Sequence, residues 1–163
     1  MKMTEKDKRE LLNYLSKHKL MSLGTNYKIP WAASVYYLCS DDFNFYFVSD
    51  PQTRHCKNIA KTPKVSITVA DSRQKSSDKK IGFQAWGEAK RITNLKEIPP
   101  LVKAWNKRGF VPMTLKLITK VWKSRFYKIR LKEVQIFDEN QTGDKEVRTW
   151  KILNEISIRS DLF

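Results

Sequence analysis

The alternation of apolar and polar residues along the chain predicts a mainly β protein. Residues 65–69 alternate strictly, as in a strand with one buried face, and residues 43–48 form an aromatic and β-branched run. The polar turn at 40–42 joins this run to the apolar segment before it as an antiparallel hairpin. Further strands are expected at 20–26, 81–92, 122–131 and 134–138.

Two of these strands also indicate what surrounds them. Strand 81–92 contains Gly82 and Gly87, which predict bulges or the close approach of another backbone, as a sharply curved barrel requires. Segment 29–39 is apolar on both faces, which is typical of a strand buried on both sides. We therefore expect segment 29–39 to lie inside a barrel wall or at a subunit interface.

Helix signals interrupt the strands. Thr4 and Asp7 form a capping pair that opens a helix through about residue 19. A second helix follows Pro51, ends at Thr62 and is expected to bury Cys56, Ile59 and Ala60. Two more helices are expected, at 94–109 and, opening at Pro112, around residues 115–118.

Together these elements predict an α+β fold, namely a six- to seven-stranded antiparallel split barrel with an N-terminal helix and inserted helices. Residues 1–140 are expected to form this barrel. Residues 141–163 change from polar to apolar, and we expect them to be a tail that packs on the barrel or on a partner subunit.

The junction between the aromatic strand and the helix after Pro51 is the first candidate site. A helix start presents unpaired backbone N–H groups, and Ser49 and Thr53 add hydroxyl donors. Basic residues follow at Arg54, His55 and Lys57, so a phosphate site is one interpretation. The alternative is ordinary helix capping by hydroxyls beside a solvated basic helix face.

The composition of the chain limits the kinds of molecule that we expect it to bind. A net charge of +15 attracts anions, but the lysines are spread along the chain and no nucleic-acid-binding motif is present, so we do not expect a nucleic-acid partner. No apolar run is long enough to span a membrane, and no secretory signal opens the chain. Cys39 and Cys56 lack metal-ligand spacing and are expected to be reduced thiols of a cytoplasmic protein.

Several kinds of catalytic chemistry are absent from the sequence. It contains no glycine-rich dinucleotide or Walker loop, no zinc-ligand pattern and no nucleophile elbow, so no metal site is expected. His55 and Cys56 are adjacent on a helix, where neighbouring side chains point about 100° apart, and we expect them not to pair. Redox chemistry would then depend on a bound organic cofactor.

The order of the elements and four strings resemble the FMN-binding split-barrel proteins related to pyridoxamine phosphate oxidase. The strings are A-A-S-V-Y-Y-L with F-Y-F-V-S, T-R-H-C-K-N-I-A-K-T-P-K-V, F-Q-A-W-G-E-A-K-R-I and Y-K-I-R-L-K-E-V-Q-I-F-D. Within that superfamily the chain looks most similar to uncharacterised YhbP-like bacterial proteins, through its T-R-H string and G-E-x-x-R strand. The resemblance implies a homodimer with FMN at the subunit interface.

The resemblance also implies which positions would contact the flavin. Ser34 to Tyr36 would lie along it, Val48 and Ser49 near its phosphate, and Gln84 near its ring. Arg54 and His55 stand where flavin-binding members often carry an Arg-Lys pair. The implied cofactor-binding residues are therefore Ser34, Val35, Tyr36, Val48, Ser49, Arg54, His55 and Gln84.

Departures from the family pattern limit the predicted function. Trp31 and Tyr36 occupy about the positions at which the family's oxidases carry an arginine and a lysine, and the terminal substrate-phosphate signature is missing. The prediction is therefore an FMN-binding protein, or a flavin-dependent oxidoreductase of unknown substrate, rather than a true pyridoxamine phosphate oxidase. The alternatives are a barrel that lost flavin and binds haem through His55 or His18, and a basic nucleic-acid-associated protein.

Overall fold

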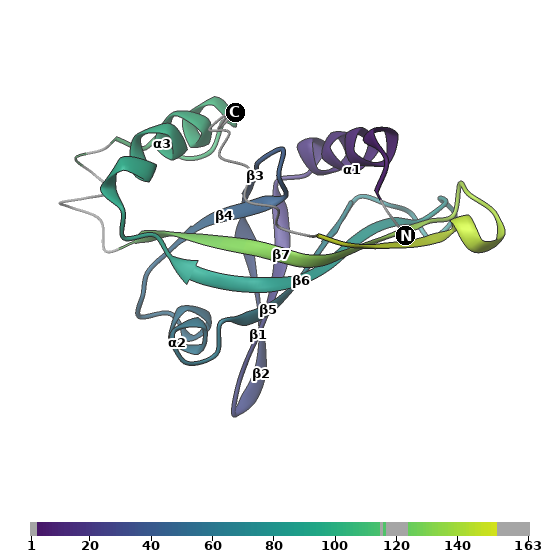
Figure 1. Ribbon diagram of the computed structural model, residues 1–163. Coiled ribbons are helices and arrows are strands. Elements are labelled where there is room, and N and C mark those ends of the chain that lie inside the picture. Colours follow the sequence, from purple (N-terminus) through teal and green to yellow (C-terminus); the bar gives the residue numbers. More distant parts are fainter. Residues whose placement is uncertain (1–2, 115, 117–123, 153–163) are drawn as a thin grey trace.

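Eight antiparallel strands form one sheet that curls into a half-barrel (Figure 1). The computed structural model describes residues 3–114, 116 and 124–152. The strands run in the order β2-β1-β5-β6-β7-β4-β3, and β8 pairs with β7. Their bounds are β1 Leu20–Tyr27, β2 Ile29–Tyr36, β3 Leu38–Cys39, β4 Asn44–Ser49, β5 Lys64–Ala70, β6 Ile81–Arg91, β7 Arg125–Asp138 and β8 Val147–Lys151. The helices are α1 Glu5–Lys17, α2 Arg54–Lys61 and α3 Ile98–Lys107, with short 3₁₀ turns at Leu95–Glu97 and Gly143–Lys145. The predicted α+β split barrel is confirmed.

The inner face of the curled sheet carries the main core. Alternate residues of β1, β5 and β4 point inward, including Leu23, Ile67 and Phe45, which are almost fully buried. Helix α1 covers this core with Leu11 and Leu15, and its N-terminus has the predicted capping box, in which Thr4 and Asp7 exchange hydrogen bonds. The alternation of apolar residues therefore decides which face of each strand is the core face.

A second, smaller core forms on the opposite side of β4 and β7. Helix α3 packs Leu101 and Trp105 there against Tyr46 and Phe126. The helix that was expected around residues 115–118 lies outside the described residues, except for Lys116. Within the described part of the chain, no helix is both long and apolar enough to cross a membrane.

The segment after residue 140 adds a strand that the sequence did not predict. Strand β8 pairs with β7 and buries Trp150 in the main core. Arg148 of the same strand makes an ion pair with Asp7 of α1, with 2.9 Å between Nη1 and Oδ1. The described part of the expected tail thus packs on the barrel, whereas residues 153–163 lie outside the described residues.

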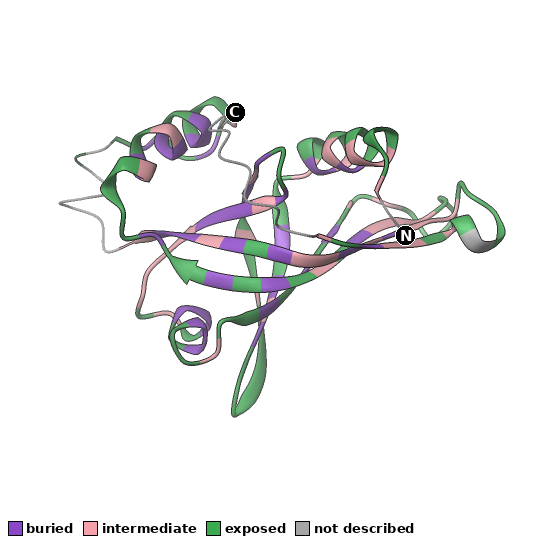
Figure 2. Ribbon diagram, in the orientation of Figure 1, coloured by how far each residue is buried: buried purple, intermediate pink, exposed green. Residues whose placement is uncertain are grey.

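Strand β2 differs from the prediction of burial inside a barrel wall. It is the edge strand at one end of the sheet order, and most of its residues are exposed (Figure 2). Ile29 is 60% exposed, Trp31 42% and Tyr36 50%. Both faces of β2 carry apolar residues that the single chain leaves exposed. Of the two interpretations of this segment, only the subunit interface therefore stays open.

Three local expectations are corrected. Segment 29–39 is not one strand, because it breaks at Tyr37 between β2 and β3. The two strands expected at 122–131 and 134–138 are one continuous strand, β7, because its polar middle pairs with β6 and β8 instead of turning. Ala60 is exposed on α2, whose buried face includes His55 and Asn58 along with Cys56 and Ile59.

Gly87 sits at an irregularity between β6 and β7. The register of the pair shifts between Trp86 and Gly87, and a Cβ atom added at Gly87 would lie 2.2 Å from the carbonyl oxygen of Arg130. The predicted close backbone approach is confirmed there. Gly82 is different, because a Cβ atom at that position would meet nothing within 4 Å.

We expect Gly87→Ala to lower the free energy of unfolding by about 2 kcal/mol or more, because backbone cannot yield as a flexible side chain can. Gly82→Ala in the same strand is the matched control and should change stability by less than about 1 kcal/mol. Urea denaturation followed by tryptophan fluorescence measures both. Equal stability of the two variants would contradict this role of Gly87.

Candidate functional site

The junction of β4 and α2 gathers hydroxyl and imidazole groups. The Ser49 Oγ atom lies 2.7 Å from Nε2 of His55 and 3.3 Å from Oγ1 of Thr53. The Thr53 hydroxyl donates to the Asp50 carbonyl oxygen at 2.7 Å and also lies 3.2 Å from His55 Nε2. Ser49, Thr53, Arg54 and His55 are called the β4–α2 corner below. His55 is buried in it and turned toward these hydroxyls.

The first turn of α2 has no side-chain cap from its N-cap residue. Thr53 occupies that position, but its side chain makes no capping hydrogen bond, since its proton is donated to Asp50 instead. Helix-start N–H groups without such partners, together with the helix dipole, attract anions. The corner therefore has the backbone chemistry of a phosphate site, and the interpretation as an ordinary hydroxyl cap does not hold for Thr53.

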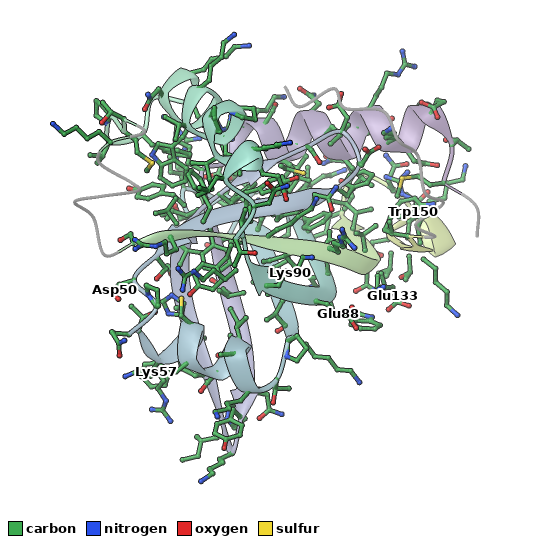
Figure 3. The ribbon with its side chains drawn as sticks, turned by 60° about the vertical axis from the view of Figure 1, so that its left-hand side comes forward. Asp50, Lys57, Glu88, Lys90, Glu133 and Trp150 are labelled. Atoms are coloured by element: carbon green, nitrogen blue, oxygen red, sulfur yellow. The ribbon has the colours of Figure 1, made fainter. Side chains whose placement is uncertain are left out.

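Arg54 supplies the exposed cation of this corner. Its guanidinium lies over the ring of Trp31 on β2, with 4.2 Å from Cζ to the ring centroid. Asp50 and Lys57 project from the same region (Figure 3). The Asp50 carboxylate accepts a hydrogen bond from the backbone N–H of Gln52 at 2.8 Å. Arg54 thus carries its charge on the exposed side of the corner, whereas His55 points inward.

Cys56 lies deeper, beneath the corner. Burial raises the pKa of its thiol, but hydrogen bonding with His55, Thr53, Tyr127 and Ser49 outweighs burial and lowers the pKa below its ordinary value. The His55 ring has its hydrogen-bond partners in Ser49 and Thr53, and the expectation that His55 and Cys56 do not pair stays a prediction. The thiol is only 2% exposed, so it supports the corner from inside and does not face solvent.

Asn58 ties the helix to the β1–β2 hairpin, which sequence reasoning did not detect. Its Nδ2 donates to Oγ1 of Thr25 at 3.0 Å, and the Thr25 hydroxyl donates to the carbonyl oxygen of Trp31 at 3.3 Å. Asn58 and Thr25 are both buried. The available signal was a polar residue three positions after His55, on the face of α2 that also carries Ile59.

Other predicted site residues lie on the opposite face of the sheet. The register places Gln84 beside Thr68, Thr68 beside Ser22, and Ser22 beside Ser34. Directly paired residues share a face, so Ser34 and Gln84 project from the side away from the main core, here called the outer face. Tyr36 shares this face and packs its ring 5.1 Å from that of Phe110.

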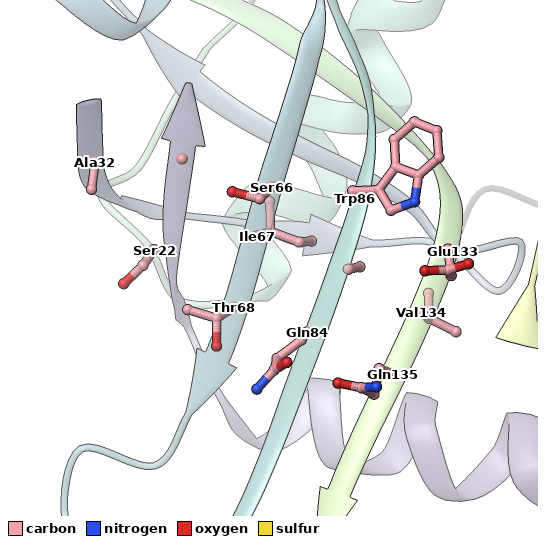
Figure 4. Close-up of a pocket in the computed structure, with 12 residues that line it drawn as sticks. Ser22, Ala32, Ser66, Ile67, Thr68, Gln84, Trp86, Glu133, Val134 and Gln135 are labelled. Atoms are coloured by element: carbon pink, nitrogen blue, oxygen red, sulfur yellow. The ribbon is translucent and has the colours of Figure 1, made fainter. Parts of the chain in front are cut away.

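The outer face is hollowed around Gln84. A cavity of about 580 Å³ opens there between β1, β5, β6 and β7. Its wall combines the hydroxyls of Ser66 and Thr68, the amide of Gln84, the indole of Trp86 and the carboxylate of Glu133 (Figure 4). A hollow of this size with a few polar groups suits a small organic ligand.

The two remaining predicted residues contribute packing. Val35 packs against the main core, and Val48 packs against the second core beneath α3. The eight predicted cofactor residues therefore divide into the β4–α2 corner, the outer face and two packing positions. Ser49, Arg54 and His55 come together, but the fold of one chain does not bring Gln84, Ser34 and Tyr36 to them.

The histidines are engaged by protein groups. His55 contacts Ser49 and Thr53, and His18 Nδ1 lies 2.8 Å from the carbonyl oxygen of Tyr14. His18 Nε2 lies 3.9 Å from a carboxylate oxygen of Asp71. No group of three or more potential metal ligands occurs among the residues that the structure describes.

A curled antiparallel sheet with a helix inserted after β4 defines a split-barrel protein. The chain belongs to the pyridoxamine 5'-phosphate oxidase family, since the model of that family matches residues 7–136. A search of curated proteins gave no match.

Solved structures of the same fold carry different names. A haem-binding protein from Mycobacterium smegmatis has a TM-score of 0.66 and 15% identity, with 93% of this chain and 61% of that chain covered. ChuZ from Campylobacter jejuni has a TM-score of 0.69 and 13% identity, with the same coverage of 93% and 61%. General Stress Protein 26 from Bacillus anthracis has a TM-score of 0.59 and 15% identity, with 79% and 92% covered. At these identities the similarity shows the fold.

Proposed function

We propose that this protein binds FMN at the interface of a homodimer and acts as a flavoprotein, as a flavin-dependent oxidoreductase of unknown substrate. When bound, FMN would supply hydride and electron transfer, which no side chain of the site provides. The observation that carries the proposal is the uncapped first turn of α2 with Arg54 beside it. Membership of the pyridoxamine 5'-phosphate oxidase family supports it.

The corner fits the phosphate end of FMN. Backbone N–H groups at the start of α2 donate along the helix dipole, and Arg54 adds a planar fork of donors. In the His55 tautomer with the proton on Nε2, the imidazole donates to the Ser49 Oγ atom. The Ser49 hydroxyl can then donate its own proton to the phosphate. Together these groups form a site for a phosphate dianion at the end of an extended ligand.

The division of residues between two faces supports a site shared by two subunits. Gln84 projects from the outer face of the sheet, whereas Arg54 belongs to α2 and contacts Trp31 on the opposite face. Strands β1 and β5 lie between β6 and the edge strand β2. A flavin held by the corner of one subunit would therefore meet the outer face of the other. The cavity around Gln84 and Trp86 would then receive the ring.

The edge strand β2 is the surface on which we propose that the subunits meet. Its exposed apolar side chains are Ile29 and Trp31 on one face and Tyr36 on the other, where Tyr36 pairs with Leu20 of β1, which is 47% exposed. Covering such side chains contributes about 25 cal/mol for each Å² removed from water. A C2 pairing would bury the same strand in both subunits.

The resemblance to YhbP-like bacterial proteins stays part of this proposal. The substitution of Trp31 and Tyr36 for two cations leaves Arg54 as the main phosphate ligand of the site. This change makes oxidation of pyridoxamine phosphate itself a poor match to the chain. Haem is the competing ligand, but both histidines already have protein partners, so no contact among the described residues favours it over FMN.

We expect wild-type protein to bind FMN and to show the visible absorbance band of a bound flavin. Arg54→Ala should weaken FMN binding about 10- to 100-fold, since a charge-assisted hydrogen bond to phosphate is lost. Riboflavin, which has no phosphate, should bind both proteins alike. Isothermal titration calorimetry measures the four affinities.

Lys61→Ala is the matched control for Arg54→Ala, because it removes the same charge from the other end of α2. Its FMN affinity should stay within about threefold of wild type. If the wild-type protein binds neither FMN nor riboflavin, the proposed function is wrong. A haem absorbance band instead, lost in His55→Ala, would replace FMN by haem.

Ala32 is an exposed residue of β2 on the outer face, and it tests the homodimer. We expect Ala32→Glu to convert a dimer into a folded monomer, because it buries an unpaired carboxylate in the proposed interface. Leu95→Glu, at a position 72% exposed and outside the sheet, should leave the dimer intact. Sedimentation velocity distinguishes the two states, and a wild-type monomer would contradict the homodimer.

A further inference from the structure

The contact between Arg54 and Trp31 has a geometry that suits anion binding. The guanidinium lies 4.2 Å from the centre of the indole ring, so the ring attracts the cation through its π face. A guanidinium carries its N–H donors in its own plane, at the edge of the group. Stacking therefore occupies a face of Arg54 and leaves the N–H edge available for a bidentate bond.

Trp31 is itself held in place relative to the helix that carries Arg54. The Asn58 amide donates to Thr25, and the Thr25 hydroxyl donates to the Trp31 carbonyl oxygen. Arg54 and Asn58 are four residues apart, so they lie on the same side of α2. The helix thus contacts the strand twice, by a buried hydrogen-bond chain to the backbone and by an exposed stack on the ring.

Little else restrains the Arg54 side chain. It is exposed, and no carboxylate of the described residues lies within ion-pair distance of it. A free arginine side chain loses rotamer entropy when it is fixed on a ligand. A ring that holds the guanidinium beforehand removes part of that cost from binding.

We propose that Trp31 is a positioning residue of the phosphate site, whose ring holds the Arg54 guanidinium with its N–H edge turned to the phosphate of a flavin. The inference rests on the proposed function and assigns to Trp31 a role that selects FMN over riboflavin. Trp31 occupies about the position of a cation in the family's oxidases. In this proposal it acts by holding Arg54, the cation that remains. It does not need to touch the ligand.

The test compares FMN and riboflavin affinities by calorimetry in wild type, in the single variants Trp31→Ala, Trp31→Phe and Arg54→Ala, and in the double variant Trp31→Ala/Arg54→Ala. Trp31→Ala should weaken FMN binding about threefold to thirtyfold, the range expected for a cation–π contact, and leave riboflavin binding within about twofold. Trp31→Phe keeps a ring and should restore most of the loss. In the Arg54→Ala background, Trp31→Ala should have no further effect, because nothing is left to position.

Tyr27→Ala is the matched control. Tyr27 lies on the same hairpin, is 40% exposed beside 42% for Trp31, and has the Lys28 ammonium 5.7 Å from its ring centroid. Its FMN affinity should equal that of wild type within about twofold. The ring-current shift of the Arg54 Cδ protons by NMR gives a second readout, present in wild type and Trp31→Phe and lost in Trp31→Ala.

The outcomes separate this inference from the proposed function. If wild type binds FMN but Trp31→Ala behaves like Tyr27→Ala, the positioning role is wrong and FMN binding stands. Affinities are compared at protein concentrations at which sedimentation shows every variant to be dimeric. If Trp31→Ala then weakens FMN and riboflavin equally, Trp31 acts through packing and the inference is overturned. If wild type binds no FMN, the proposed function fails and the inference fails with it.

Discussion

The open edge of the sheet at β2 is the constraint on which the rest of the structure depends. The hairpin β1–β2 reaches away from the barrel, joined to it by pairing with β5 and by the Asn58–Thr25–Trp31 hydrogen bonds. A strand with apolar residues on both faces cannot remain uncovered without cost. The same strand carries Trp31 toward α2 and Tyr36 toward the outer face. Strand β2 therefore has residues beside both groups of candidate site residues, with Trp31 beside Arg54 and Ser34 on the same face as Gln84.

Strand geometry explains why the eight predicted residues do not converge in one chain. Side chains alternate between the two faces of a strand, so neighbours in sequence such as Ser34 and Val35 are separated by the whole sheet. Val35 reaches the core, whereas Ser34 reaches the outer face with Gln84. Residues that are identified together by sequence similarity can thus lie on opposite faces of the sheet. Such residues can line one site only if a second subunit supplies part of it.

Much of the fold could be predicted from the sequence because local signals agreed with the final structure. The Thr4 and Asp7 capping box formed, and the alternation at 65–69 gave the buried face of β5. Gly87 marked a real backbone contact. Strand β8 was missed because it is short and follows a polar stretch, and only its partner β7 gives it a place in the sheet.

The site was less predictable, for physical reasons that particular residues show. Ser49, Arg54 and His55 are close in sequence, so their proximity could be predicted, but the inward turn of the His55 ring toward the Ser49 and Thr53 hydroxyls could not. The Asn58–Thr25 bond joins residues that are 33 positions apart. Whether a polar residue on a helix is a partner or a solvated group depends on such distant contacts.

Mixed dimers test the central claim most directly, because the claim is that each ligand site combines the corner of one subunit with the outer face of the other. Arg54→Ala damages the corner, and Gln84→Trp fills the outer-face cavity. Neither variant should bind FMN tightly alone, but a dimer containing one of each would have one intact site, or about one site in four after random mixing. Recovery of that fraction of tight FMN binding is the predicted result. No recovery in mixed dimers of confirmed composition would contradict a site shared between subunits.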